Sequence, residues 1–269
     1  MLRSLSLYWR LVGVQIRAQL QYRTNFWFDV ITAGMMTIIS FGSLALIIQR
    51  FGSIAGWSLA ELAFLYGMVE AAFGVMDMLF SGFDPGTFGR QVRLGLLDQL
   101  MLRPVDVVLQ IFSSDLALRR LGRITQGAFV FILAIYWLDI SWTLPKVLYL
   151  PLVFFSMVCF FGGLFVIGSA VTFWTVDSIE VMNIFTYGGA EMMSYPMNIY
   201  SNWMRRVFTY IIPAIFLNYY PALFFLDKPD PFGMPSVVYW LSPVVGFCTL
   251  WLGLSFFSFG LRNYQSTGT

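Results

Sequence analysis

Three acidic side chains lie inside long apolar stretches and are the first residues to consider for chemistry. Glu70 and Asp77 fall within the stretch from Leu59 to Phe80, and Glu191 falls within the stretch from Val181 to Trp203. A carboxylate inside a membrane-spanning helix is costly, so such groups often serve proton relays or substrate paths. The simpler alternative is that each carboxylate only hydrogen-bonds to a neighbouring helix.

Glu191 has the stronger claim of the three because of its neighbours. Tyr187 and Tyr195 lie one helical turn away on either side, and two glycines closely precede it. Glu191 could therefore kink its helix or face a translocation path. The candidate path comprises Glu70, Asp77, Tyr187, Glu191 and Tyr195.

The sequence lacks the side chains that most enzymatic reactions need. The chain has no histidine, which removes the commonest general base and the commonest neutral metal ligand. Its two cysteines, Cys159 and Cys248, sit in apolar runs and are no disulfide framework. Neither of its two lysines, Lys146 and Lys228, ends a glycine-rich phosphate loop. The chain therefore has no means of hydrolysing a nucleotide, and we expect no catalytic, cofactor or metal site.

The elements that carry these residues are membrane-spanning helices. Hydrophobic residues make up 58% of the 269 residues and charged residues only 11%, whereas soluble domains carry about a quarter. A net charge of +2 gives no indication of nucleic-acid binding. A crossing takes about 20 apolar residues. We predict an all-α integral membrane protein with six crossings: 30–49, 59–80, 124–138, 147–176, 181–203 and 231–261.

The second crossing carries a face of small and acidic residues. Gly67, Glu70, Gly74 and Asp77 recur on one narrow side of the helix. Small residues allow close helix packing, and carboxylates avoid lipid. This face is predicted to lie in the interior of the bundle.

The only long polar stretch between crossings runs from residue 84 to residue 123. It holds six of the fourteen arginines, which predicts a cytoplasmic loop. Asp84 and Pro85 resemble an N-cap and a first helical position, and Pro104 a stop. We predict a short amphipathic helix between them, with apolar positions Phe88, Val92, Leu94, Leu97 and Met101. Its apolar face could enter a groove on a partner, or pack on this chain's own cytoplasmic helix.

The N-terminal segment, residues 2–22, is predicted to be an amphipathic helix in the membrane interface. Leu5, Trp9, Val12 and Ile16 fall on one side, and three arginines at heptad spacing fall on the other: Arg3, Arg10 and Arg17. A basic tail without this structure is the alternative.

The segment Val207–Leu226 is uncharged but contains Pro213 and Pro221, which predicts a re-entrant or broken helix before the sixth crossing. With both termini inside, eleven of the sixteen basic residues are cytoplasmic, which supports an N-in, C-in topology. A seventh crossing at 207–226 would instead place the C-terminus outside.

This arrangement, together with several local sequences, resembles one family over essentially the whole chain. The sequences are Gln21-Tyr22-Arg23, Gly56-Trp57, the loop RLGLLDQLMLRP at 93–104 and the end RNYQSTG at 262–268. They resemble the bacterial branch of ABC-2 type permeases, the membrane subunits of ATP-driven exporters. The resemblance implies a single transmembrane domain over 1–269 in the bacterial cytoplasmic (inner) membrane, with residues 1–24 as connecting helix.

What the resemblance implies further is a set of partners. A second permease subunit, identical or homologous, and separate ATPase subunits that bind ATP and Mg²⁺ would join this chain among membrane lipids. The family's coupling helix would correspond to residues 88–103, with Phe88, Val92, Leu94, Leu97, Asp98, Met101 and Arg103. The competing hypothesis is a proton-coupled secondary transporter that uses Glu70, Asp77 and Glu191, although no inverted repeat is visible.

Overall fold

The chain folds into a bundle of helices, seen in a computed structural model that describes residues 10, 13–17, 19, 21, 23–175 and 181–265. Regular structure in the described residues is helical, apart from an isolated bridge between Ile54 and Trp57. The long helices are α2 (Arg23–Phe51), α3 (Leu59–Leu79), α7 (Leu121–Trp137), α8 (Leu144–Thr175), α9 (Val181–Met193) and α12 (Ser242–Arg262).

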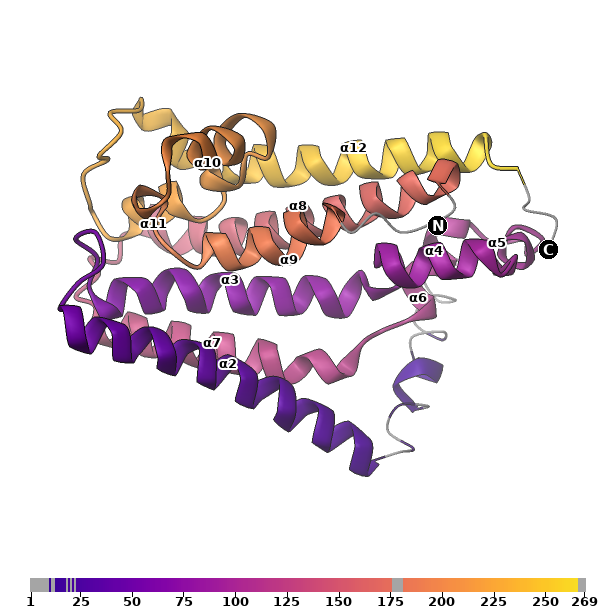
Figure 1. The fold of residues 1–269 in the computed structure, drawn as a ribbon, viewed down its shortest axis with the longest axis horizontal. Helices are drawn as coiled ribbons and strands as arrows, with labels where there is room; N and C mark the ends of the chain where they lie inside the picture. Colours follow the sequence, from indigo (N-terminus) through magenta and orange to yellow (C-terminus); the bar gives the residue numbers. More distant parts are fainter. Residues whose placement is uncertain are drawn as a thin grey trace.

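Shorter helices gather at the two ends of the bundle (Figure 1). One end, which we name the loop end, carries α4 (Pro85–Arg93), α5 (Leu96–Met101) and α6 (Val107–Ser114). The opposite end, which we name the broken-helix end, carries α10 (Asn202–Arg206) and α11 (Tyr219–Phe225).

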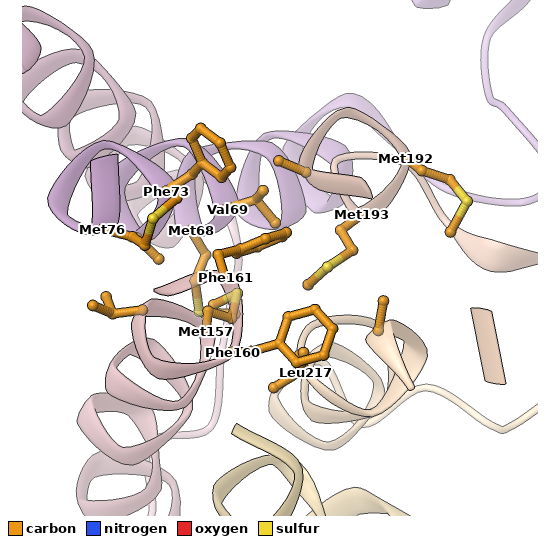
Figure 2. Close-up of a cluster of buried hydrophobic side chains, with 14 of the residues drawn as sticks. Met68, Val69, Phe73, Met76, Met157, Phe160, Phe161, Met192, Met193 and Leu217 are labelled. Carbon is orange, nitrogen blue, oxygen red and sulfur yellow. The ribbon is translucent and has the colours of Figure 1, made fainter. Parts of the chain in front are cut away.

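Helix α3 lies at the centre of the bundle. Its N-terminus carries a capping box in which Ser58 and Glu61 bond each other's backbone N–H groups, which fixes where the helix begins. Most of its residues are buried, since α7, α8 and α9 pack around it. Figure 2 shows the core between these helices, with Met68, Val69, Phe73 and Met76 of α3, Met157, Phe160 and Phe161 of α8, and Met192, Met193 and Leu217.

Glycines let the backbones approach closely at two helix pairs. A Cβ on Gly67 of α3 would lie 2.5 Å from the backbone nitrogen of Phe131 on α7. A Cβ on Gly253 of α12 would lie 2.7 Å from the carbonyl oxygen of Gly163 on α8. Such close packing is the usual way that helices associate where lipid removes the hydrophobic driving force. The predicted interior face of α3 is thus confirmed, since all four of its residues are buried.

Three helices of the described residues are long and apolar enough to cross a membrane: α3, α8 and α12. A fourth crossing is obtained if the bent pair Asn202–Ile211 and Ala214–Phe225, with an angle of 79° between its halves, counts as one span. The predicted break in residues 207–226 is therefore present. The predicted crossings 30–49 and 124–138 lie within or beside α2 and α7, and the complete six-crossing arrangement stays a prediction.

The predicted fifth crossing, 181–203, is wrong as a single helix. Helix α9 ends at Met193 after 13 residues, which span only about 20 Å. Pro196 follows within three residues, and proline has no N–H for a helical bond and disfavours helix in the residue before it. Ser194 closes the helix by donating its N–H towards the carbonyls of Ala190 and Glu191.

Two further boundaries need correction. The last helix begins at Ser242 rather than near Pro231, with Pro243 in its first turn and a 3-10 helix (Ser236–Trp240) before it. The predicted loop helix is split into α4 and α5 at Gly95, whose φ of 66° lies in the left-handed region that ends an α-helix.

Most of the predicted N-terminal interfacial helix lies outside the described residues, including Arg3, Leu5, Trp9 and Val12. Arg10 and Arg17 are described, and both are exposed. The amphipathic pattern of the whole segment therefore stays a prediction.

Candidate functional site

The candidate site lies at the loop end, where two arginines join the carboxylates of α3. The guanidinium of Arg123 donates two hydrogen bonds to Glu70, from Nε to Oε2 at 2.6 Å and from Nη2 to Oε1 at 2.8 Å. The same guanidinium lies 4.4 Å from the ring centre of Phe73. Glu70 is only 4% exposed, so its charge is balanced inside the bundle by a two-pronged partner.

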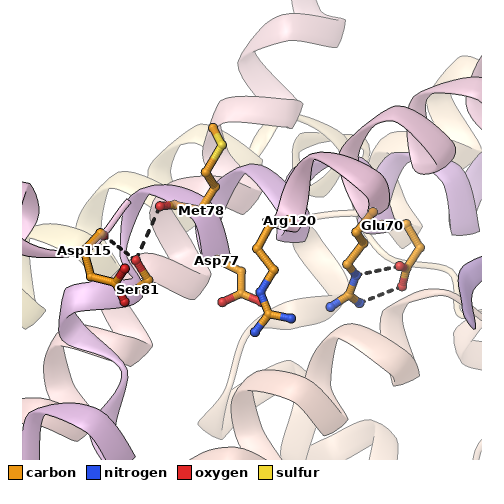
Figure 3. Close-up of polar contacts among 7 residues, drawn as sticks. Glu70, Asp77, Met78, Ser81, Asp115 and Arg120 are labelled. Carbon is orange, nitrogen blue, oxygen red and sulfur yellow. Dashed lines mark hydrogen bonds and ion pairs between the residues drawn. The ribbon is translucent and has the colours of Figure 1, made fainter. Parts of the chain in front are cut away.

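Asp77 has the second arginine as its partner. Arg120 Nε lies 2.8 Å from Asp77 Oδ2, within ion-pair distance, although the two groups are not aligned as a hydrogen bond. Figure 3 shows Arg120 beside Asp77, and Glu70 further along α3. Two of the six loop arginines thus turn into the bundle. The antiparallel order of Asp77 with Arg120 and Glu70 with Arg123 was a signal for this pairing that sequence reasoning missed.

The end of α3 is also tied to the loop chain before α7. Ser81 Oγ donates a hydrogen bond to the carbonyl of Asp115 (Figure 3), and the N–H of Ala117 donates to the carbonyl of Met78 at 3.3 Å. These bonds satisfy backbone groups where α3 stops. A displacement of the loop would therefore also displace the end of α3.

Helix α4 is anchored on the ends of α8 and α12. Asp84 caps α4 by accepting the N–H of Thr87 at 3.0 Å, as the sequence predicted. Phe88 is fully buried, with its ring centre 5.7 Å from Phe173 of α8 and 5.6 Å from Phe257 of α12. Val92, one turn later, is buried as well. Both residues therefore fasten the loop to the spanning helices.

The turn at Gly95 sorts the predicted coupling residues into two groups. Leu97 is 1% exposed and belongs to the core, so it does not share an exposed face with Leu94 and Met101 but packs on this chain, as the alternative interpretation of the face had it. Leu94 and Met101 are exposed, and Leu102 is 86% exposed. The left-handed turn rotates α5 relative to α4, which breaks the single face that a continuous helix would have. Of the remaining predicted residues, Asp98 is half-buried and Arg103 is exposed.

Helix α6 completes the loop element and meets the N-terminal segment. Gln110 Nε2 donates to the carbonyls of Leu100 and Val105, at 3.0 and 2.9 Å, and so holds the turn between α5 and α6. Gln15 Nε2 donates to the carbonyl of Ser114 at 2.7 Å. Gln19 accepts the N–H of Leu118 at 3.1 Å. A cavity of about 390 Å³ lies in this region, lined by Val14, Gln15, Leu100, Arg103, Val105, Gln110, Ser113 and Ser114.

Of the predicted path residues, some are linked to the Glu70–Arg123 pair and others are exposed or only half-buried. Tyr187 lies 5.2 Å from Phe73, whose ring also faces Arg123, so Tyr187 joins the Glu70 pair through one aromatic ring. Tyr195 is half-buried against the core. Glu191 is exposed on α9, and the described residues offer its carboxylate no hydrogen-bond or ion-pair partner.

At the opposite end, the chain's two lysines fasten the segment that follows α11. Lys146, 3% exposed, donates to Asp227 Oδ2 at 2.7 Å, the carbonyl of Phe225 at 3.0 Å and Ser141 Oγ at 3.2 Å. The hydrogen bond from Lys146 lowers the pKa of Asp227. Asp227 has a φ of 51°, an uncommon conformation for a residue with a side chain.

The second lysine makes a comparable contact to α3. Lys228 Nζ donates to Glu61 Oε1 at 2.7 Å and to the carbonyl of Gly56 at 3.0 Å, and lies 4.6 Å from the Trp57 ring centre. Residues 225–228 are therefore held to both α8 and α3. Sequence reasoning used these lysines to exclude a phosphate-binding loop and to count basic residues for the topology, and it missed their structural role.

A comparison with models of protein families identifies the family of this chain. The model of the ABC-2 family transporter proteins matches residues 34–268. The chain belongs to the ABC-2 transporter family. It is the membrane component of an ABC transporter, a multi-pass protein without an ATPase domain, and the family implies ATPase partners that bind ATP. A comparison with curated proteins and one with solved structures gave no match.

Proposed function

We propose that this ABC-2 permease moves substrate outward across the bacterial cytoplasmic membrane, powered by separate ATPase subunits that bind ATP and Mg²⁺. Residues 1–269 form one transmembrane domain in this proposal. The chain crosses the membrane six times with both termini inside, so the loop end is cytoplasmic and the broken-helix end is external. The distribution of basic residues supports this orientation.

The observation that carries the proposal is the two-sided construction of the loop element. One side is fixed to the spanning helices through Phe88 and Val92. Leu94, Met101 and Leu102, beside or within α5, are exposed, and α5 lies at the loop end (Figure 1). An ATPase can move spanning helices only through contact outside the membrane, and exposed apolar side chains are suited to that contact. Residues 84–123 are thus the coupling loop.

The substrate path in this proposal involves a second permease subunit, identical or homologous to this one. Glu191 supports it, because a carboxylate without a partner among the described residues would be costly on a helix that faces lipid. Another subunit would shield Glu191, and the space between the subunits would form the path. In this proposal Tyr187 and Tyr195 lie beside Glu191 at the path. Glu70 and Asp77, each paired with an arginine, lie deeper in the subunit and do not face the path.

The secondary-transporter alternative is less consistent with the geometry. A proton relay needs carboxylates that can exchange protons along a chain. Glu70 and Asp77 instead each have an arginine partner at 2.6 to 2.8 Å, so both carboxylates are already engaged in ion pairs. Glu191 alone is left for such a relay.

Replacing two exposed coupling-loop residues tests the proposal. In the Leu94→Asp/Leu102→Asp variant, charge enters the ATPase contact, and we expect about tenfold less co-expressed ATPase subunit to co-purify. The permease itself should stay folded, because both side chains are exposed in the isolated chain.

Val237→Asp is the matched control, since Val237 is 60% exposed at the broken-helix end. It should retain the ATPase. Retention by the Leu94/Leu102 variant of both the ATPase and transport would show that this surface is not the coupling contact.

A further inference from the structure

The broken-helix end contains a pocket that the transport proposal does not use. Its volume is about 390 Å³. Helix α10, the π-helical turn Val207–Ile211 that continues it, and the segment after α11 contribute its walls. The lining residues are Asn202, Arg205, Arg206, Thr209, Tyr210, Ile215, Tyr220, Phe232 and Met234.

The pocket has an excess of positive charge. Two of its lining residues are arginines and none is acidic. Within the described part of the chain, no ion pair involves Arg205 or Arg206. The nearby carboxylate of Asp230 is already used in its own turn, where it accepts the N–H groups of Phe232 at 3.0 Å and Met234 at 2.7 Å. The guanidinium groups therefore remain available to an anion.

Arg205 is held in place before any ligand arrives. Its guanidinium lies 4.6 Å from the ring centre of Phe232, and its Nη2 donates a hydrogen bond to Asn202 Oδ1. Among the described residues, its other N–H groups have no hydrogen-bond partner. A guanidinium that is fixed in this way loses less conformational entropy on binding an anion.

The surroundings of the pocket indicate where in the membrane it lies. Exposed aromatic residues flank it, with Trp203 at 67% and Tyr210 at 76% exposure. Tryptophan and tyrosine are enriched at the level of lipid headgroups. Ile215, Phe232 and Met234 add an apolar wall to the same pocket. Arginines, an apolar wall and exposed aromatic residues thus occur together here, a combination typical of the headgroup level.

From these observations we infer that the pocket binds a phosphate group, and specifically the headgroup phosphate of an anionic phospholipid. Arg205 and Arg206 donate to the phosphate oxygens, since guanidinium groups match phosphate geometry. The apolar wall receives the first part of the lipid's acyl region. The site is defined by its residues, so it does not depend on the direction of transport or on the ATPase contact.

Fluorescence anisotropy of tail-labelled phosphatidylglycerol tests the site on full-length permease in detergent. We expect Arg205→Gln/Arg206→Gln to bind this probe about tenfold more weakly than the wild type, through lost charge-assisted hydrogen bonds. Arg50→Gln is the matched control, since Arg50 is an exposed arginine at the end of α2 that does not line the pocket. It should bind like the wild type.

Competition distinguishes the two sources of phosphate. If the ligand is a lipid, glycerol 1-phosphate and inorganic phosphate at the probe's concentration leave the anisotropy unchanged. Displacement by either compound would keep the phosphate site but assign it to a free phosphate compound. Unchanged probe binding in the double variant, or an equal loss in Arg50→Gln, would overturn the site.

A single substitution keeps the test valid if the double variant does not fold. Arg206 is exposed and makes no contact with Phe232 comparable to that of Arg205, so Arg206→Gln should preserve the melting temperature. It should still weaken probe binding several-fold. Wild-type affinity in this folded variant would also overturn the inference.

Discussion

The two ends of the permease secure their helices with different cations. At the loop end, Arg120 and Arg123 hold the carboxylates of α3 inside the bundle. At the broken-helix end, Lys146 and Lys228 bond backbone carbonyls as well as the carboxylates of Asp227 and Glu61. A planar guanidinium suits a two-pronged contact with one carboxylate, whereas an ammonium can serve several oxygens around it.

In the proposed function the loop end transmits motion from the ATPase, whereas the broken-helix end is held by contacts within the chain. The arginine pairs join α3 to the first residues of α7 and to the turn before it, and the loop element beside them also has exposed apolar side chains. The lysines instead fasten one short segment, residues 225–228, to two helices of the same chain. We therefore expect the loop end to depend on a partner and the broken-helix end to depend on its own contacts.

The largest effect is expected at the buried Glu70 pair. Glu70→Ala should lower the free energy of unfolding by about 3–5 kcal/mol, because it leaves the guanidinium of Arg123 without its counter-charge. Thermal unfolding of purified permease in detergent would measure this loss.

The control for the Glu70 pair removes both charges at once. Glu70→Gln/Arg123→Gln should be clearly more stable than Glu70→Ala, since no uncompensated charge remains. If Glu70→Ala unfolds at the wild-type temperature, the pair does not hold α3 to α7.

A smaller loss is expected at the lysine contacts. Lys146→Met keeps much of the side-chain volume but leaves the carbonyl of Phe225 without this donor, so we expect about 1–3 kcal/mol of destabilisation. The Lys228→Met variant should lose less, because Lys228 is more exposed than Lys146. Equal losses in chemical unfolding of the two variants would contradict this ranking.

The smallest effect concerns acid sensitivity at Asp227. Lys146 lowers the pKa of Asp227 in the folded chain, so the Lys146–Asp227 contact stabilises the fold fully above the ordinary aspartate pKa, about 3.9. This stabilisation of the fold is lost as the pH falls towards the lowered pKa. The difference in melting temperature between wild type and Asp227→Asn should therefore be present at pH 6 and shrink towards pH 3. A difference that grows on acidification would refute the contact.

Periodicity and composition predicted much of the fold. The apolar runs placed α3 and α8, the acid and glycine face correctly predicted the interior of α3, and Asp84 with Pro85 predicted where α4 begins. Pro213 also signalled the break between Ile211 and Ala214, whereas Pro221 lies within α11.

The rest depended on local geometry or on contacts between distant residues. The sequence contains 23 glycines and does not show which of them interrupt a helix. The positive φ of Gly95 is visible only in the structure, where the chain turns at this residue and Leu97 of α5 is buried. Pro196 shortens α9, although hydropathy continues past it. The partners of Glu70 and Lys146 lie 53 and 81 residues away. The antiparallel order of the two arginine pairs was a signal for the first contact, whereas the second contact had no such signal in the sequence.

Site-directed cross-linking tests the central claim, that the coupling loop contacts the ATPase. Leu102→Cys would be introduced after both native cysteines, Cys159 and Cys248, are replaced by alanine. With a co-expressed ATPase subunit and a short thiol-to-amine cross-linker, we predict a covalent permease–ATPase product from Leu102→Cys and none from Val237→Cys. A product from Val237→Cys, or none from Leu102→Cys in a complex that still hydrolyses ATP and transports, would contradict the account.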